Sequence, residues 1–174
     1  VNTGNLSIIK TTQNNNGQVG GFIFRVKNSE GKVIGTYTSK SDGRILIPDI
    51  QAGRYVVEEI NLSDEFVKPA KNPVEVEVKS GQTATVNFEN IRKQGIITVQ
   101  KINSRPNMGD YSLAGAEFTV KDQNGTVVYT IITGSDGRGQ SKPLPLGSYI
   151  TAETKAPWGF VIDKNEYTRT LSGS

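Results

Sequence analysis

Two copies of one sequence unit make up this chain. Residues 21–59 align with residues 115–153 at a constant offset of 94 and without a gap, and 14 of the 39 aligned positions are identical. Upstream, the segment GNLSIIK, which ends at Lys10, aligns with GIITVQK, which ends at Lys101. Because internal repeats fold into similar modules, any fold proposed for this chain must suit each half separately.

The repeat predicts two domains, residues 1–93 and residues 94–174. Each contains about seven short segments of alternating apolar and polar residues, separated by turns rich in Gly, Asp and Ser. This spacing is typical of a β-sandwich, and each module is long enough for a small one. The sequence therefore predicts an all-β fold of two tandem small β-sandwiches. In the first, residues 73–91 are predicted to form a hairpin around a Ser80-Gly81 turn.

Composition excludes several classes of site. The chain has no Cys and no His, which excludes disulfides, thiol or imidazole catalysis, and zinc sites built on these residues. No carboxylate loop of the calcium-binding kind occurs, and we expect neither a metal nor another cofactor. The 20 basic and 17 acidic residues form no basic, aromatic-rich cluster, so we expect no nucleic-acid partner. No run of about 18 apolar residues occurs, so we expect no membrane insertion in this segment.

Polar residues stand at the inner ends of several apolar strand faces. Because alternate residues of a strand share a face, Lys10, Glu59 and Asn90 each extend a row of apolar residues that should face a core. The second copy repeats two of these residues as Lys101 and Glu153. An unpaired charge in such a place is costly, so the repetition calls for an explanation.

Three interpretations of these residues are open from the sequence. In the first, they lie at strand ends and extend to water, as a single lysine commonly does. In the second, Lys and Glu form a buried salt bridge, although desolvation often cancels the attraction within such a pair. In the third, the residues react with one another.

The third interpretation follows from the effect of burial on charge. A lysine in an apolar core has a lowered pKa and a glutamic acid has a raised one, because burial disfavours both charged forms. The neutral amine is a nucleophile, and the protonated acid polarises the carbonyl of a neighbouring asparagine before passing its proton to the departing ammonia. The product is a Lys–Asn amide crosslink that forms once per molecule, with fixed proximity supplying much of the barrier reduction.

The segment GSYITAETKAPWGF, residues 147–160, resembles the G-x-Y-x-x-x-E-T-x-A-P-x-G-[YF] signature of Cna B-type domains, also called SpaA-like or prealbumin-like pilin domains. The first copy has a looser version, GRYVVEEINLSDEF, without the Ala-Pro pair. SLAGAEFTVKDQNG and VGGFIFRVKNSEG resemble a second segment of the family. The resemblance covers the chain twice, and it implies prealbumin-like, reverse immunoglobulin-like sandwiches from a Gram-positive surface adhesin or pilin.

In this family an intramolecular isopeptide bond joins a first-strand lysine to a last-strand asparagine, with help from a buried acid. Carried to this sequence, the resemblance implies a crosslink between Lys10 and Asn90 in the first domain, with Glu59 as the catalytic acid. In the second domain it implies Lys101 as the crosslinking lysine and Glu153 as the catalytic acid.

The second domain departs from the family pattern because it has no matching asparagine. Its C-terminal TLSGS resembles VKSGQ, which precedes the last strand of the first copy, so the second sandwich is expected to lack its last strand. Asn165 comes too early and is expected in a loop. The partner of Lys101 is therefore expected beyond Ser174, either cut away or supplied by another chain, and the open edge would invite strand addition.

The resemblance implies a structural stalk or spacer of a cell-surface protein, extracellular and anchored to the cell wall through regions outside this segment. Its partners would be neighbouring domains of the same surface protein or pilus. A host extracellular-matrix protein such as collagen is the alternative partner, and Trp158, the single tryptophan, is either a contact residue for it or a cap on the sandwich end. We expect no enzyme with a diffusible substrate, because the residues support only the single-turnover crosslinking.

Overall fold

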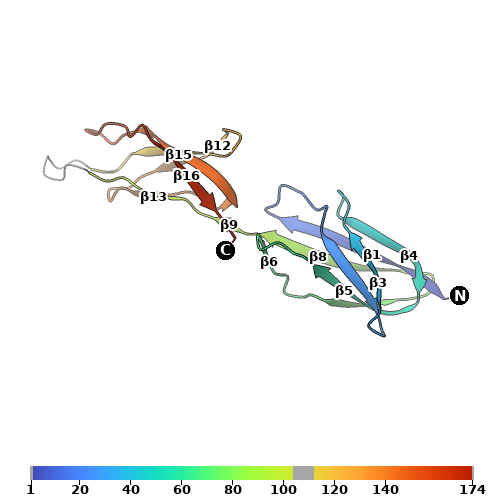
Figure 1. The fold of residues 1–174 in the computed structure, drawn as a ribbon. Helices are drawn as coiled ribbons and strands as arrows, with labels where there is room; N and C mark the ends of the chain where they lie inside the picture. The colour runs from blue at the N-terminus through green and yellow to red at the C-terminus, as the bar shows by residue number, and fades with distance from the viewer. Residues whose placement is uncertain (1, 104–111, 174) are drawn as a thin grey trace. The chain divides into compact units, whose positions relative to one another are not determined.

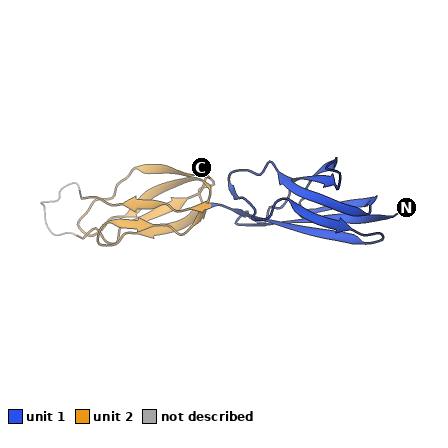
Figure 2. Ribbon diagram, turned by 90° about the horizontal axis from the view of Figure 1, so that it is seen from below, with its two compact units in different colours: residues 1–93 blue, residues 94–174 orange. Residues whose placement is uncertain are grey.

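The computed structural model describes residues 2–103 and 112–173 (Figure 1). The chain divides into two compact units, Val1–Lys93 and Gln94–Ser174, called unit 1 and unit 2 (Figure 2). Strands and turns account for all regular structure among the described residues, so they include no helix that could cross a bilayer. The predicted all-β fold of two tandem sandwiches is confirmed.

Unit 1 is a sandwich of two four-stranded sheets with the strand orders β4-β1-β8-β6 and β3-β2-β5-β7. Its core consists of the apolar side chains that alternate toward the space between the sheets. The strands are β1 Thr3–Gln13, β2 Ile23–Asn28, β3 Val33–Thr38, β4 Arg44–Gln51, β5 Gly53–Ile60, β6 Phe66–Val67, β7 Val74–Val78 and β8 Thr83–Arg92.

The first and last strands of unit 1 lie side by side and run parallel. In the register of β1 and β8, Lys10 stands opposite Phe88 and Thr12 stands opposite Asn90. Lys10 and Thr12 share a face because they are two residues apart. Lys10 and Asn90 therefore lie on the same face of neighbouring strands, as a diagonal pair.

The hairpin predicted for residues 73–91 is wrong. β7 pairs with β5 in one sheet, whereas β8 pairs with β1 and β6 in the other. A tight turn, closed by a hydrogen bond from Gln82 N to Lys79 O at 3.1 Å, carries the chain between the sheets. Alternation tells which face of a strand is buried, but it does not tell which sheet the strand joins, and so the crossover was missed.

Unit 2 has one four-stranded sheet, β12-β11-β15-β16, and two strand pairs, β10-β13 and β14-β9. β16 pairs with β15 as β7 pairs with β5, and β10 pairs with β13 as β1 pairs with β4. Among the described residues, no strand flanks β10 where β8 flanks β1 in unit 1. The strands are β9 Gln94–Gly95, β10 Thr98–Gln100, β11 Glu117–Lys121, β12 Val127–Ile132, β13 Arg138–Gln140, β14 Leu144–Pro145, β15 Gly147–Lys155 and β16 Glu166–Leu171.

Candidate functional site

Lys10, Glu59 and Asn90 come from β1, β5 and β8, and they meet in the core of unit 1. Their exposed fractions are 1%, 5% and 0%. Each continues a row of buried apolar residues, as strand alternation requires. The interpretation in which these side chains extend to water is therefore wrong for unit 1, while the salt bridge and the reaction both fit the burial.

The carboxyl group of Glu59 binds the amide of Asn90. Asn90 Nδ2 donates to Glu59 Oε1 at 2.9 Å and to Oε2 at 2.8 Å, and Asn90 Oδ1 is buried without a hydrogen-bond partner among the described residues. The sequence-based hypothesis instead placed the carboxyl group of Glu59 against the amide oxygen of Asn90. A half-turn of the amide about its Cβ–Cγ bond exchanges nitrogen and oxygen, and a protonated Glu59 then donates to Oδ1.

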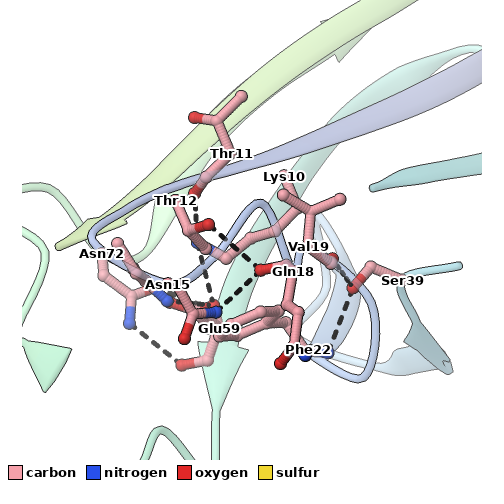
Figure 3. A network of polar contacts seen from close by, with 11 residues as sticks. Lys10, Thr11, Thr12, Asn15, Gln18, Val19, Phe22, Ser39, Glu59 and Asn72 are labelled. Atoms are coloured by element: carbon pink, nitrogen blue, oxygen red, sulfur yellow. Dashed lines mark hydrogen bonds and ion pairs between the residues drawn. The ribbon is translucent and has the colours of Figure 1, made fainter. Parts of the chain in front are cut away.

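The amine of Lys10 also lies near the carboxyl group of Glu59. Its Nζ is 3.8 Å from Glu59 Oε2 and donates to the backbone oxygen of Thr11 at 3.0 Å (Figure 3). One carboxyl group is thus hydrogen-bonded to the Asn90 amide and lies 3.8 Å from the Lys10 amine. A small closing movement would bring it within proton-transfer reach of both groups.

Burial shifts both ionisable groups toward their neutral forms. It lowers the pKa of Lys10 from 10.5 to about 8, although the charges of Glu59 and Glu89 act in the opposite direction. It also raises the pKa of Glu59, against the hydrogen bond from Asn90 and the charge of Lys10. A proton that passes from Lys10 to Glu59 leaves the net charge of the pair unchanged, so the neutral pair needs no outside proton source.

The repeated Ser-Asp-Gly-Arg turn holds the backbone of the lysine in both units. Lys10 N donates to Gly43 O and Lys101 N donates to Gly137 O, each at 2.7 Å. The two glycines have φ angles of 76° and 79°, and a Cβ atom on them would lie 2.4 Å and 2.3 Å from the lysine carbonyl oxygen. Only glycine allows both the backbone conformation and the close approach.

Phe22 and Asn15 close the end of the unit 1 site (Figure 3). The Phe22 ring centroid is 4.6 Å from Lys10 Nζ, and Phe66 packs edge-on against that ring with 5.5 Å between centroids. Asn15, which is 7% exposed, folds its loop by donating to a backbone carbonyl at 2.7 Å. Sequence reasoning missed Phe22 because its counterpart in the second copy is Ala116, so the repeat gives no signal there.

Lys101 and Glu153 also meet in unit 2, but solvent reaches the lysine. Lys101 Nζ is 3.2 Å from Glu153 Oε1 and 3.1 Å from Oε2. The Lys101 side chain is 12% exposed, whereas the Lys10 side chain is 0% exposed. The backbone N–H of Asp163 donates to Glu153 Oε1 at 2.7 Å. The unit 2 pair is therefore a close ion pair at the edge of the core.

The lysine of unit 2 is exposed because a groove runs beside it. The groove has a volume of about 950 Å³ and is lined by β10 and β13 on one side and by Phe118, Thr151 and Glu153 of the facing sheet on the other. β8 fills the corresponding place in unit 1. Asn165 lies just before β16, outside any strand, and its N–H donates to the side chain of Asp163 at 2.9 Å.

Trp158 lies in the loop after β15 and is 83% exposed, so the interpretation of this residue as a cap on the sandwich end is wrong. Val161 in the same loop is 85% exposed. In unit 1 the matching Phe66–Val67 segment is β6, which pairs with β8. The loop of unit 2 thus presents apolar side chains where unit 1 has a paired strand.

Both units match one family of known proteins. The family model described as a prealbumin-like fold domain, SpaA, matches residues 4–92 and residues 95–173. The chain is 28% identical over 150 residues to serine-aspartate repeat-containing protein D of Staphylococcus aureus strain Newman, a match that covers 76% of this chain and 11% of that protein. The chain thus spans about a tenth of this relative's length.

Two solved structures have a similar fold. The Bacillus anthracis TIE protein aligns with a TM-score of 0.78 and 27% identity, over 97% of this chain and 31% of that one. The C-terminal fragment of the pilus adhesin SpaC from Lactobacillus rhamnosus GG aligns with a TM-score of 0.65 and 17% identity, over 98% of this chain and 83% of that one. At that identity the second likeness concerns the fold alone.

Proposed function

The chain belongs to the family of SpaA prealbumin-like domains, and from this premise we propose that it is a structural stalk or spacer segment of a Gram-positive cell-surface adhesin or pilus subunit. Unit 1 is stabilised by a self-formed isopeptide bond between Lys10 and Asn90, with Glu59 as the catalytic acid. The protein works outside the cell, anchored to the cell wall through regions outside this segment, and its partners are neighbouring domains of the same surface protein or pilus.

The burial of Lys10, Glu59 and Asn90 in one dry cluster carries this proposal. A salt bridge alone explains the arrangement less well, because both carboxylate oxygens are occupied by Asn90 while Lys10 Nζ lies 3.8 Å away. A buried ion pair of that geometry recovers little of its desolvation cost. A diagonal lysine and asparagine with an acid between them are, in contrast, the reactants and the proton carrier of an amide exchange.

The reaction balances within the cluster. The neutral amine of Lys10 attacks Cγ of Asn90 while protonated Glu59 polarises the amide oxygen. The C–N bond between Lys10 Nζ and Asn90 Cγ forms, the bond to the amide nitrogen breaks, and Glu59 carries one proton from the lysine amine to the leaving nitrogen. Ammonia departs and the glutamic acid is regenerated, so the chain loses about 17 Da. Fixed proximity, with effective molarities of roughly 10⁵ M or more, supplies much of the acceleration.

The bond suits a stalk because it joins the two ends of the unit. A crosslink between residues 10 and 90 contributes roughly 4–5 kcal/mol by the loop-entropy estimate for a closed loop of this size. A pull on the two ends of unit 1 then passes through covalent bonds rather than through the strand ladders between them. The stabiliser also needs no cysteine and no oxidising environment.

For unit 2 we propose that Lys101 forms the equivalent link with an asparagine outside these 174 residues, with Glu153 as the catalytic acid. Three features support this: the repeated Lys–Glu pair, the repeated glycine contact to the lysine backbone, and the groove beside β10. A strand that runs parallel to β10, as β8 runs parallel to β1, would bring its asparagine to this pair.

Intact-mass spectrometry of the full chain tests the unit 1 bond. The wild-type chain is expected to weigh about 17 Da less than its sequence mass. Glu59→Gln should restore the full mass because glutamine cannot shuttle the proton. The matched variant Glu153→Gln changes the same residue type at the equivalent position of unit 2 and should keep the deficit. A full-mass wild-type chain would favour the salt bridge and overturn the proposal.

Binding of a host extracellular-matrix protein such as collagen is a second candidate function, favoured by the exposure of Trp158 and Val161 in one loop. Aromatic residues are enriched among the residues that dominate binding energy at interfaces. Surface plasmon resonance against matrix proteins, with Trp158→Ala as the comparison, tests this role. Affinity that Trp158→Ala abolishes would support it, and no affinity for any matrix protein would leave the stalk role alone.

A further inference from the structure

Asn72 binds the backbone of Glu59 through its side chain (Figure 3). The N–H of Glu59 donates to Asn72 Oδ1 at 2.9 Å, and Asn72 Nδ2 donates to the carbonyl oxygen of Glu59 at 3.0 Å. This pair of bonds copies the way in which a neighbouring antiparallel strand binds both polar groups of one residue. The Asn72 side-chain amide thus replaces the backbone hydrogen bonds that a neighbouring strand would make to Glu59.

The strand register explains why Asn72 is in this place. The β5–β7 ladder pairs Val57 with Val74, and continuing the register by two residues on each strand sets Glu59 opposite Asn72. β7 begins at Val74, so its backbone ladder stops short of Glu59. Without the Asn72 amide, two backbone groups at a 5% exposed residue would lose their partners, which is costly in a dry site.

The two hydrogen bonds from Asn72 also fix the backbone from which the carboxyl group of Glu59 extends. Both carboxyl oxygens bind a single nitrogen of Asn90, at 2.9 Å and 2.8 Å. A small rotation of the Glu59 backbone would break this symmetric contact. Misplacement of a reacting group by about 1 Å can cost on the order of a hundredfold in rate.

We propose that Asn72 is a positioning residue for the Lys10–Asn90 linkage. Its amide completes the hydrogen bonding of the Glu59 backbone at the end of the β5–β7 ladder, and it thereby holds the Glu59 carboxyl group against the Asn90 amide. The inference rests on the proposed function of unit 1, and Asn72 acts through Glu59 rather than on the reacting atoms.

Unit 2 has an asparagine at the same register position but holds its acid in another way. Continuing the β15–β16 register by one residue beyond Ala152 and Glu166 sets Asn165 opposite Glu153. The N–H of Asn165 donates to the Asp163 side chain, and the N–H of Asp163 donates to the Glu153 carboxylate. In unit 2 the support therefore contacts the carboxylate itself. In unit 1 the Asn72 side chain binds the Glu59 backbone, and both carboxyl oxygens of Glu59 bind the Asn90 amide.

Time-resolved mass spectrometry of newly made chain tests the positioning role. The full chain is produced by cell-free synthesis, translation is stopped, and the loss of about 17 Da is followed over time at a series of pH values. The variants are Asn72→Ala, which removes both bonds, and Asn72→Asp, which keeps the acceptor for the Glu59 N–H and the size of the side chain. Asn87→Ala is the matched control, because Asn87 is exposed on β8, the strand that carries Asn90.

We expect Asn72→Ala to slow the linkage by about tenfold to a hundredfold, Asn72→Asp to slow it less, and Asn87→Ala to leave it unchanged. The pH of the maximum rate should also move down in Asn72→Ala. A loosened Glu59 gains water, its pKa falls toward the ordinary value, and the protonated acid is then present only at lower pH. A variant that was merely less stable would keep the pH of the maximum.

Two results separate the inference from the function on which it rests. If the wild-type chain never loses 17 Da, the linkage itself fails and the role of Asn72 fails with it. If the wild-type chain links and both Asn72 variants link at the same rate and with the same pH profile, only the positioning role is overturned. Because Asn72→Asp preserves the shape of the side chain, it remains informative if Asn72→Ala does not fold.

Discussion

Unit 1 and unit 2 carry the same lysine and the same glutamic acid at repeated positions, yet the two pairs stand in different surroundings. In unit 1 the lysine side chain is 0% exposed and the acid is bonded to an asparagine amide. In unit 2 the lysine side chain is 12% exposed, lies against the acid at 3.1 Å, and borders an open groove.

The difference shows that the environment of the lysine is not set by its own strand. Lys10 lies in β1 and Lys101 directly follows β10, and the residue before each lysine pairs with the arginine of the repeated turn. A glycine holds each lysine backbone in the same way. What differs is β8, which covers Lys10 on one side and brings Asn90 to it. The strand that carries Asn90 is thus also the strand that shields Lys10 from water.

The largest effect should come from removing the proposed link in unit 1. Glu59→Gln is expected to lower the stability of unit 1 by roughly 4–5 kcal/mol, the entropy estimate for the lost crosslink. For a domain of this size that corresponds to a fall in melting temperature of about 20 °C or more. Differential scanning calorimetry of the full chain should show this fall in one transition, with the unit 2 transition unmoved. If the unit 1 transition occurred at the same temperature in the wild-type chain and in Glu59→Gln, unit 1 would have no stabilising crosslink that unit 2 lacks.

A pH effect of up to about 3 kcal/mol should appear in unit 1 when the link is absent but Lys10 remains, as in Asn90→Ala. The pKa of Lys10 is about 8 in the folded chain and 10.5 when it is solvated. Between these values the unfolded chain holds a proton that the folded chain has released, so stability rises with pH across this window. Urea unfolding at pH 7.5 to 10.5 measures the rise.

The double variant Asn90→Ala/Lys10→Met is the control for that experiment, because it lacks the titrating amine and retains every other group. The stability of Asn90→Ala relative to the double variant should rise as the pH increases. A constant difference would mean that Lys10 is not desolvated in the folded unit, and the contrast with Lys101 would then have no electrostatic basis.

Glu153→Gln should have a smaller effect, confined to unit 2. It removes the partner of Lys101 and weakens the bond from the Asp163 N–H, at a cost of about 1–2 kcal/mol. The cost is limited because the partly exposed Lys101 can turn toward the groove and solvate its charge. The shift of the unit 2 calorimetric transition measures it. A loss as large as that of Glu59→Gln in unit 1 would mean that the unit 2 pair is held as firmly as a crosslinked one.

Trp158→Ala should have the smallest effect, within about 0.5 kcal/mol, because the side chain is 83% exposed. Neither the mass deficit nor the unit 1 transition should change. A clear loss of unit 2 stability would show that the loop after β15 packs on the sandwich, contrary to its exposure in the structure.

The repeat and strand alternation were sufficient to predict the all-β sandwich class of each unit and the faces that are buried. Lys10, Glu59 and Asn90 were found because each breaks the apolar pattern of its row. Their proximity could not come from alternation, which contains no information on which strands become neighbours. The parallel pairing of β1 with β8, and the crossover that replaced the predicted hairpin, follow from the packing of the two sheets as a whole.

The supporting residues Asn72 and Phe22 were missed for different reasons. Asn72 acts through the backbone of a residue 13 positions away, and its loop breaks no hydrophobic pattern. A search of the repeat beyond Glu59 would have found it, since Lys71-Asn72 recurs as Lys164-Asn165. Phe22 has no counterpart of its kind in the second copy, so only the structure shows that its ring covers the amine. The crosslink itself stays a prediction.

The parallel pairing of the first strand with the last also determines when the proposed crosslinking could begin. Before unit 1 folds, the segment that becomes β8 has not docked beside β1. Lys10 is then an ordinary hydrated ammonium group, and an ordinary ammonium group does not attack amides. Under the proposed mechanism the sandwich must close before the reaction starts, so the mass of a chain would record whether its first unit ever reached the native state.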